Sequence, residues 1–195
     1  MDEEKRLPQD SRSGILIKME KIVFSAKELG RIRKAGTKRM ETLLNVTLEI
    51  AGNSIVIESR TDDSFNEYLA ASILEAVGFG FDIDRALMLR NIDHILRKIE
   101  LKADRRKNII AGRLIGTRGR TKKAMERVSG CEIIITDHVV GILGKSGDVE
   151  VAAKAILAII RGAPQGKAVS GLEKDKARLR RIEDDVEKFI ENNFL

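Results

Sequence analysis

Two glycines three positions apart, Gly116 and Gly119, constrain the fold of this chain more than any other feature, because of the residues around them. Apolar residues recur at helical spacing before this pair, and the short basic segment after it ends at Ser129-Gly130, a typical helix C-cap. Residues 131–136 contain three consecutive isoleucines and are expected to form a strand. The stretch 108–136 therefore predicts a helix, a tight glycine loop, a second helix and a strand.

The positive charge of the chain is concentrated on the same stretch. Positions 102–123 contain nine Lys or Arg residues against one acid, Asp104, which gives this window a net charge of +8 in a chain of +6. Glycines let a backbone come close to a ligand, and the N-terminus of the following helix offers free N–H groups that suit a phosphate. These features favour an anion-binding loop, and the alternative is an ordinary turn on a solvated basic face.

Helix, GxxG loop, helix and strand, in that order, form the core of a KH domain, whose loop holds about four nucleotides of single-stranded RNA. On this interpretation the loop backbone would bind phosphates, while Ile115, Val128 and Ile133 would offer an aliphatic floor to the bases. Aromatic residues make up only 4% of the chain, which argues against recognition by stacking on aromatic side chains.

An earlier part of the chain repeats the same order of elements. Gly36 aligns with Gly119 at an offset of 83, and the segments that follow match at 85, so the first copy is about two residues shorter here. Residues 33–36 keep at most one glycine of the motif. The fold class predicted is α+β, with two tandem type I KH domains, each β-α-α-β-β-α, followed by a C-terminal helix.

The predicted domain organisation has five parts. Residues 1–11 are expected to be a disordered leader, 12–82 the first KH domain, 83–89 a linking helix, 90–162 the second KH domain, and 163–195 a charged amphipathic helix. That helix either packs back on the protein or binds a partner. The first domain carries an auxiliary basic surface, which either contacts RNA or only surrounds a folded support; its residues are Arg33, Lys34, Lys38 and Arg39.

Several functional classes are disfavoured by the sequence. No apolar run approaches the roughly 20 residues of a membrane helix, and the polar, acidic start of the chain is unlike a secretory signal. A single cysteine fits a reducing compartment, so a cytoplasmic protein is expected. The two histidines, His94 and His138, lie in no metal or triad spacing, and no P-loop is present. We therefore expect neither an enzyme nor a cofactor, a metal or a small-molecule substrate.

Three stretches give the chain a specific resemblance that extends over nearly all of it after residue 12. These are AGRLIGTRGRTKKAMERVSG, GFGFDIDRALML and RGAPQGKAVSGLEKDKARLRR. They closely resemble the archaeal two-KH-domain small-subunit ribosome assembly factors, which are related to the eukaryotic protein called partner of Nob.

The resemblance implies that the chain binds small-subunit rRNA near its 3′ end and works with a partner endonuclease of the Nob type. It also implies the RNA-binding residues: Gly116, Thr117, Arg118 and Gly119 as the clamp, flanked by Arg113, Arg120, Lys122 and Lys123. The alternatives are a protein-interaction adaptor and a general RNA-binding regulator without rRNA specificity.

Overall fold

A computed structural model describes residues 20–61, 64–101 and 107–194 of the chain. The first unit contains β1 (Glu20–Val23), α1 (Ala26–Ala35), α2 (Lys38–Leu44), β2 (Val46–Ala51), β3 (Ser54–Ser59) and α3 (Ser64–Phe79). A short helix α4 (Ile83–Ala86) and a 3-10 turn η1 (Leu87–Arg90) follow. The second unit contains β4 (His94–Glu100), α5 (Lys107–Ile115), η2 (Thr117–Gly119), α6 (Arg120–Ser129), β5 (Glu132–Ile135), β6 (Val139–Lys145) and α7 (Ser146–Ile160). The helix α8 (Gln165–Phe194) comes last.

The two sheets have the same antiparallel topology. Their strand orders are β1-β3-β2 and β4-β6-β5, so in each unit the last strand lies between the other two. In the first sheet Ile55 pairs with both Ile22 and Ile50. Three antiparallel strands in this order, with helices between the first and second strands and after the third, define a type I KH domain. The predicted fold class is confirmed.

Local signals in the sequence explain several element boundaries. Ser25 caps α1 in a reciprocal capping box, because its side chain accepts from the Glu28 N–H while Glu28 accepts from the Ser25 N–H. The Ser25 hydroxyl also donates to the Glu28 carboxylate, and this bond, together with the one from the Ser25 N–H, holds the pKa of Glu28 below its ordinary value. Gly52, with φ of 64°, allows the tight turn between β2 and β3.

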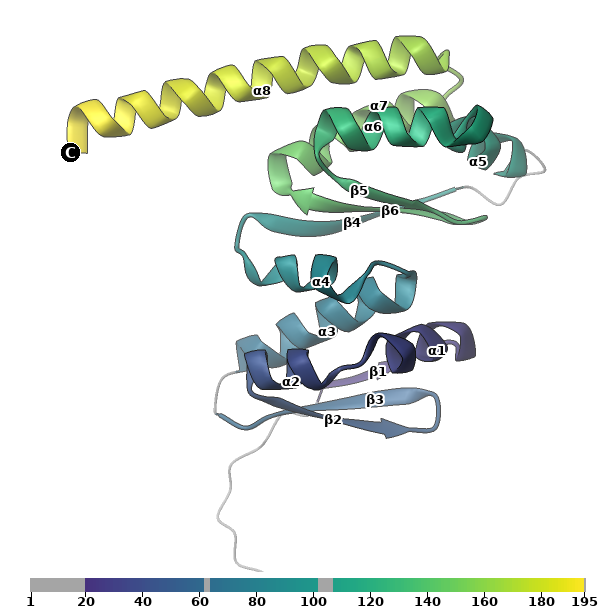
Figure 1. Ribbon diagram of the computed structural model, residues 1–195, viewed down its shortest axis with the longest axis vertical. Helices are drawn as coiled ribbons and strands as arrows, with labels where there is room; N and C mark the ends of the chain where they lie inside the picture. The colour runs from purple at the N-terminus through teal and green to yellow at the C-terminus, as the bar shows by residue number, and fades with distance from the viewer. Residues whose placement is uncertain (1–19, 62–63, 102–106, 195) are drawn as a thin grey trace, which may run out of the picture.

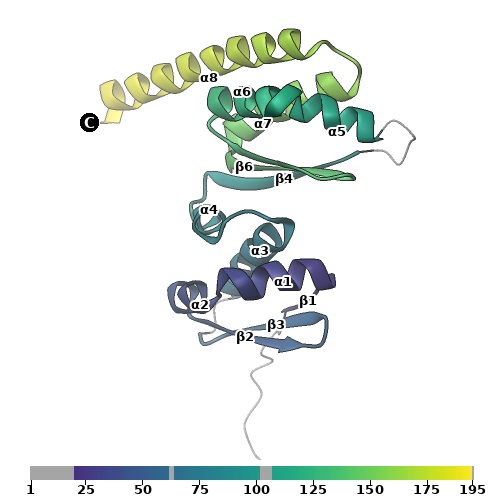
Figure 2. The ribbon, with the colours of Figure 1, turned by 45° about the vertical axis from the view of Figure 1, so that its right-hand side comes forward.

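The two units are stacked in layers rather than side by side (Figures 1 and 2). The first sheet lies at one end, its helices cover it, and the second sheet covers those helices with its outer face. Leu143 of β6 belongs to the core of the first unit, and Gly141 lies against the rings of Phe79 and Phe81. A Cβ at Gly141 would come within 2.5 Å of Phe79 Cε1, so only glycine allows this approach. The stack is therefore a packed interface.

The helix α8 covers the outer side of the second unit's helices along the first part of its length (Figure 1). Ala168 and Leu172 are buried there. Lys176 forms a half-buried ion pair with Asp148 at the start of α7. Residues 180–193 are all exposed, and this half of the helix projects beyond the body of the protein.

Most predicted elements are present, with a few differences. The predicted linking helix consists of two pieces, α4 and η1. The spacing of Phe65 from Leu69 and Ile73 predicts that it lies on the apolar face of α3, but it is 62% exposed in the first turn of this helix. The predicted leader, a strand starting near Ile15, and a helix cap at Asp62 or Asp63 lie outside the described residues.

Candidate RNA-binding surface

Gly116 and Gly119 both adopt backbone conformations that favour glycine, but for different reasons. Gly116 has φ of 72° and ψ of 172°, and a Cβ there would lie 2.2 Å from Thr121 Oγ1. Gly119 has φ of 75° and ψ of 14°, and an added Cβ would find its nearest neighbour, Lys123 Cε, 4.0 Å away. Gly116 is therefore required for packing of the loop against α6, whereas Gly119 leaves the loop surface open.

Between the two glycines the loop makes a single tight turn. The Gly119 N–H donates to the Gly116 carbonyl at 3.0 Å. Arg118 has φ of 53°, a left-handed conformation that is uncommon for a residue with a side chain. Thr117 and Arg118 are both exposed. The loop thus presents its outer backbone and two side chains to solvent.

The helix α6 begins directly after this loop, and its N-terminus is arranged for an anion. No side chain caps it and no acidic residue lies in its first turn. Its first-turn N–H groups and the positive end of its dipole can therefore receive a phosphate. Arg120 and Lys123 are exposed beside it, and Lys122 is half-buried in an ion pair with Glu126 at 3.4 Å.

Arg113 is held away from this surface. Its guanidinium donates to the carbonyls of Ile159, Gly162 and Ala163 at 3.1, 3.3 and 2.6 Å, where α7 ends. In the first unit Arg31 does the same for α3, donating to the carbonyls of Gly78 and Phe79. A cation at a helix C-terminus satisfies terminal carbonyls and the helix dipole. Arg113 therefore anchors the helix that leads into the loop.

The apolar residues near the loop are only partly accessible. Ile115 is 39% exposed and Val128 is half-buried, so both can meet a ligand. Ile133 is fully buried in the core beneath α5 and α6, because the alternation of β5 points its side chain at the helices. Its side chain is not available as a floor for bases.

The backbone of β5 offers the polar edge of the surface. Among the described residues this strand pairs with β6 alone, and the Ile133 N–H on its other side donates to Glu126 Oε1 at 3.0 Å. Because the N–H and C=O of one strand residue point to the same side, and this side alternates along the strand, the backbone groups of Ile133 and Ile135 face this open edge. The GxxG loop, α6 and the β5 edge form one surface.

The corresponding loop of the first unit is shorter. Gly36 keeps a positive φ of 78°, but α2 has seven residues where α6 has ten. The first copy therefore lacks one glycine and about one helical turn, and its shorter helix carries an acid, Glu41, in its first turn. Its basic residues Arg33, Lys34, Lys38 and Arg39 are exposed, and Arg39 forms an ion pair with Asp84.

Other chemical groups do not assemble into a site within the described ranges. His94 lies against Asp93, with Nδ1 2.6 Å from Oδ1, and His138 is exposed in the turn between β5 and β6. Burial raises the pKa of the Cys131 thiol to about 11. Among residues 20–61, 64–101 and 107–194, no group of three or more His, Cys, Asp or Glu residues could hold a metal ion. In the same residues no helix is long and apolar enough to cross a bilayer.

Comparison with known proteins adds independent information. The model of the second KH domain of Pno1, a eukaryotic-type (type I) KH domain, matches residues 92–177. A KH domain-containing protein of Methanocaldococcus jannaschii is 27% identical over 190 residues, 94% of this chain and 78% of the relative. The pre-rRNA-processing protein Pno1 of Emericella nidulans is 30% identical over 146 residues. The matched region is 70% of this chain, and it spans only 57% of the length of that relative.

A solved structure is similar to this chain in its fold as well as in its sequence. Dim2p of Pyrococcus horikoshii, seen in a complex of a/eIF2alpha, aDim2p and rRNA, matches with a TM-score of 0.74 and 27% identity. The match covers 83% of this chain and 95% of the matched chain.

Proposed function

Because the chain is similar to Pno1 and Dim2 proteins, we propose that it is a two-KH-domain protein of their family and that it binds single-stranded small-subunit rRNA near the 3′ end of that rRNA. Through this binding it assists the maturation of the small ribosomal subunit, without catalysing a reaction itself. The observation that carries the proposal is the uncapped N-terminus of α6 behind an exposed, positively charged GxxG loop.

In this proposal the RNA backbone lies over residues 116–119 and the first turn of α6. Arg118, Arg120 and Lys123 neutralise phosphates, and Lys122 contributes from its pair with Glu126. The bases lie over Ile115 and Val128 and meet the open backbone edge of β5. Four neutralised phosphates on a single strand correspond to a log–log salt slope of about −3, at about 0.7 per contact.

In this arrangement the polar groups along the edge of β5 determine which RNA sequence is preferred. The edge of β5 offers the carbonyl of Ile133 and the N–H and carbonyl of Ile135. The Ile133 N–H already donates to Glu126 Oε1. Carbonyl and carboxylate oxygens accept hydrogen bonds from the exocyclic amino groups of adenine and cytosine. We therefore expect the base nearest Glu126 to carry an amino group.

The experiment that tests the proposal compares one substitution at two equivalent places. Gly119→Asp puts a carboxylate among the loop cations, and Gly36→Asp puts it in the shorter loop of the first unit. Both glycines have similar positive φ, 75° and 78°, and no atom closer than 4.0 Å to an added Cβ. Their ψ angles differ: Gly119 is left-handed, with ψ of 14°, which costs a residue with a side chain about 1–2 kcal/mol, whereas Gly36, with ψ of 124°, lies outside that region and costs more. The free energy of unfolding of both variants is therefore measured beside their RNA binding.

Each protein is crosslinked to small-subunit rRNA and titrated with a single-stranded RNA carrying its 3′-terminal sequence. We expect Gly119→Asp to weaken binding at least about tenfold, equivalent to 1.4 kcal/mol, and to lose the crosslinks near the 3′ end. Gly36→Asp should bind nearly as wild type. Normal binding by Gly119→Asp would refute the proposed site, and a loss in Gly36→Asp alone would move it to the first unit.

A partner endonuclease of the Nob type is part of the same proposal, and only the family relationship supports it. The direct test is cleavage of a pre-rRNA 3′ end by the endonuclease with and without this protein. Stimulation that is lost with Gly119→Asp would support joint action on the RNA. An unchanged cleavage rate would leave RNA binding as the whole function.

A further inference from the structure

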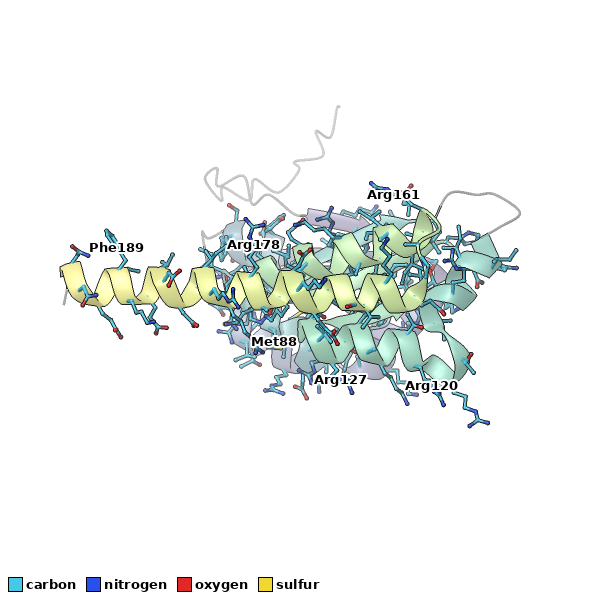
Figure 3. The ribbon with its side chains drawn as sticks, turned by 90° about the horizontal axis from the view of Figure 1, so that it is seen from above. Met88, Arg120, Arg127, Arg161, Arg178 and Phe189 are labelled. Carbon is cyan, nitrogen blue, oxygen red and sulfur yellow. The ribbon has the colours of Figure 1, made fainter. Side chains whose placement is uncertain are left out.

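The second half of α8 carries an apolar stripe that none of the residues described by the structure covers. Ile182, Val186, Phe189 and Ile190 are 52%, 52%, 62% and 47% exposed. Their spacing of three and four residues places them on one side of the helix. Figure 3 shows Phe189 on the projecting end of the helix, away from the rest of the protein. An exposed stripe of this kind marks an interaction surface.

The first half of α8 carries a complementary feature. Together with α7 it borders a groove of about 250 Å³ lined mainly by alanine and glycine, including Ala155, Ala158, Ala168 and Gly171. Lys154, Lys167 and Asp175 also line this groove. Small side chains leave space for larger ones from outside, and the two lysines favour an acidic occupant.

Stripe and groove lie on the same side of one helix. The groove residues Ala168, Gly171 and Asp175 are followed by Leu179, Ile182 and Val186, at spacings of three, four, four, three and four residues. At 3.6 residues per turn this series follows a single line along α8. Val186 lies 18 residues after Ala168, which is five full turns.

We propose that α8 pairs in antiparallel orientation with α8 of a second copy of this chain, so that the stripe of each copy fills the groove of the other. With Asp175 of one copy opposite Leu179 of its partner, Ile182 and Val186 lie along the groove beside the exposed Gly171. The arrangement is reciprocal and closes on itself by twofold symmetry, which is the commonest form of a homodimer.

The charges of the two halves are complementary in this arrangement. The half that carries the stripe contains five acids, at positions 183, 184, 185, 187 and 191, against three basic residues, Arg180, Arg181 and Lys188. It would lie over a groove whose lining includes Lys154 and Lys167. The acid within the groove, Asp175, would lie near Arg178 of the other copy. Charge thus favours the antiparallel orientation over the parallel one, in which acidic halves would meet.

The pairing leaves the proposed RNA surface free. In Figure 3 the helix α6, with Arg120 and Arg127, lies on one side of α8, whereas Arg161, Arg178 and Phe189 lie on the other side. A dimer formed through the α7–α8 groove would therefore present two open GxxG loops. Self-association and RNA binding are then separable properties.

The test measures the mass of the full chain by sedimentation from low micromolar to several hundred micromolar protein. The wild type should shift from 21.7 kDa toward twice that mass as the concentration rises. Phe189→Asp, which places a charge in the stripe, and Gly171→Leu, which fills the groove, should both remain monomeric.

Gly166→Leu is the matched control. Gly166 and Gly171 lie in the same helix, and a Cβ at either position meets no atom within 4 Å, so neither change strains the monomer. Five residues turn the helix by about 140°, which takes Gly166 away from the groove side. This variant should dimerise as the wild type does.

Circular dichroism and RNA titration of each variant verify that the fold and the RNA surface are intact. A wild type that stays monomeric throughout would overturn the inference. A dimer that persists in both Phe189→Asp and Gly171→Leu, or one that Gly166→Leu also abolishes, would overturn it as well. None of these outcomes bears on the proposed RNA binding, because that is measured separately in the same proteins.

Discussion

Replacing Gly116 by alanine should destabilise the second unit more than the same change at Gly119. At Gly116 the backbone has φ of 72° and ψ of 172°, a region that residues with a side chain almost never occupy, at a cost of about 1–3 kcal/mol. The new Cβ would also lie 2.2 Å from Thr121 Oγ1 and 2.9 Å from Thr121 Cβ and N. Thr121 is buried at the start of α6, so relief requires moving the helix, at about 1–3 kcal/mol.

The two costs together give about 4 kcal/mol, a large part of the 5–15 kcal/mol that is typical of a domain. Gly119→Ala is the control, because its φ of 75° and ψ of 14° cost about 1–2 kcal/mol and the new Cβ has open space. Urea unfolding of both variants gives the free energies of unfolding. We expect Gly116→Ala to lose about 2–3 kcal/mol more than Gly119→Ala, the share of the Thr121 contact.

A double-mutant cycle separates the contact from the backbone strain. Thr121→Ala removes the hydroxyl at 2.2 Å but keeps the backbone nitrogen at 2.9 Å. Gly116→Ala should therefore cost less in the Thr121→Ala protein than in the wild type, by about 1 kcal/mol or more. Equal costs in the two backgrounds, or equal losses for Gly116→Ala and Gly119→Ala, would refute the reasoning that packing against α6 requires this glycine.

Three further predictions test other parts of the structure. Gly141→Ala should lower the free energy of unfolding by about 1–3 kcal/mol, because its Cβ would meet the Phe79 ring across the stacked units; no loss in urea unfolding would contradict that packing. Glu126→Gln should cost about 1 kcal/mol in the same assay, since a neutral acceptor replaces the carboxylate at the Ile133 N–H; an unchanged stability would mean that this bond contributes nothing. Cys131 should react with iodoacetamide far more slowly in the native protein than in urea at pH 8. Stability should also fall from about pH 9 toward 11, because the unfolded thiol loses its proton first; fast native labelling or a flat pH profile would contradict this.

The sequence predicts the elements of this fold well because their boundaries depend on short-range signals. Ser25 with Glu28 starts a helix, Gly52-Asn53 forms a turn, and Gly130 ends a helix in the left-handed conformation. Each signal acts through hydrogen bonds or backbone angles within four residues. The duplication then transfers a fold recognised in one unit to the other.

The roles of individual site residues depend on contacts that short-range patterns do not contain. The resemblance implies an RNA contact for Arg113, which lies in the basic segment before the loop, yet its hydrogen-bond partners are about 50 residues away in the sequence. A signal was available: Gly30-Arg31-Ile32 repeats as Gly112-Arg113-Leu114 at an offset of 82. An arginine kept in both copies, when only one copy has the GxxG loop, indicates a structural role in the fold.

The difference in residue number between matching positions of the two copies shows what the first copy lacks. This difference is 82 before the loop and 85 after it, so the second copy contains three extra residues, one more than the two that the sequence analysis expects. These residues are the difference in length between α2 and α6. The first copy therefore lacks about one helical turn after the loop, which a count of glycines alone does not reveal.

The order of the layers follows from two helices that are apolar on nearly all sides. Both α3 and α7 have buried residues around most of their circumference, and such a helix must be covered on two faces. Each packs on its own sheet, which leaves one face to be covered by something else. The second sheet covers α3, and the first half of α8 covers α7. The family model that ends at residue 177 thus includes the part of α8 that completes this core. The part beyond it covers no helix among the described residues, which is why its apolar stripe is the surface that we propose for a second chain.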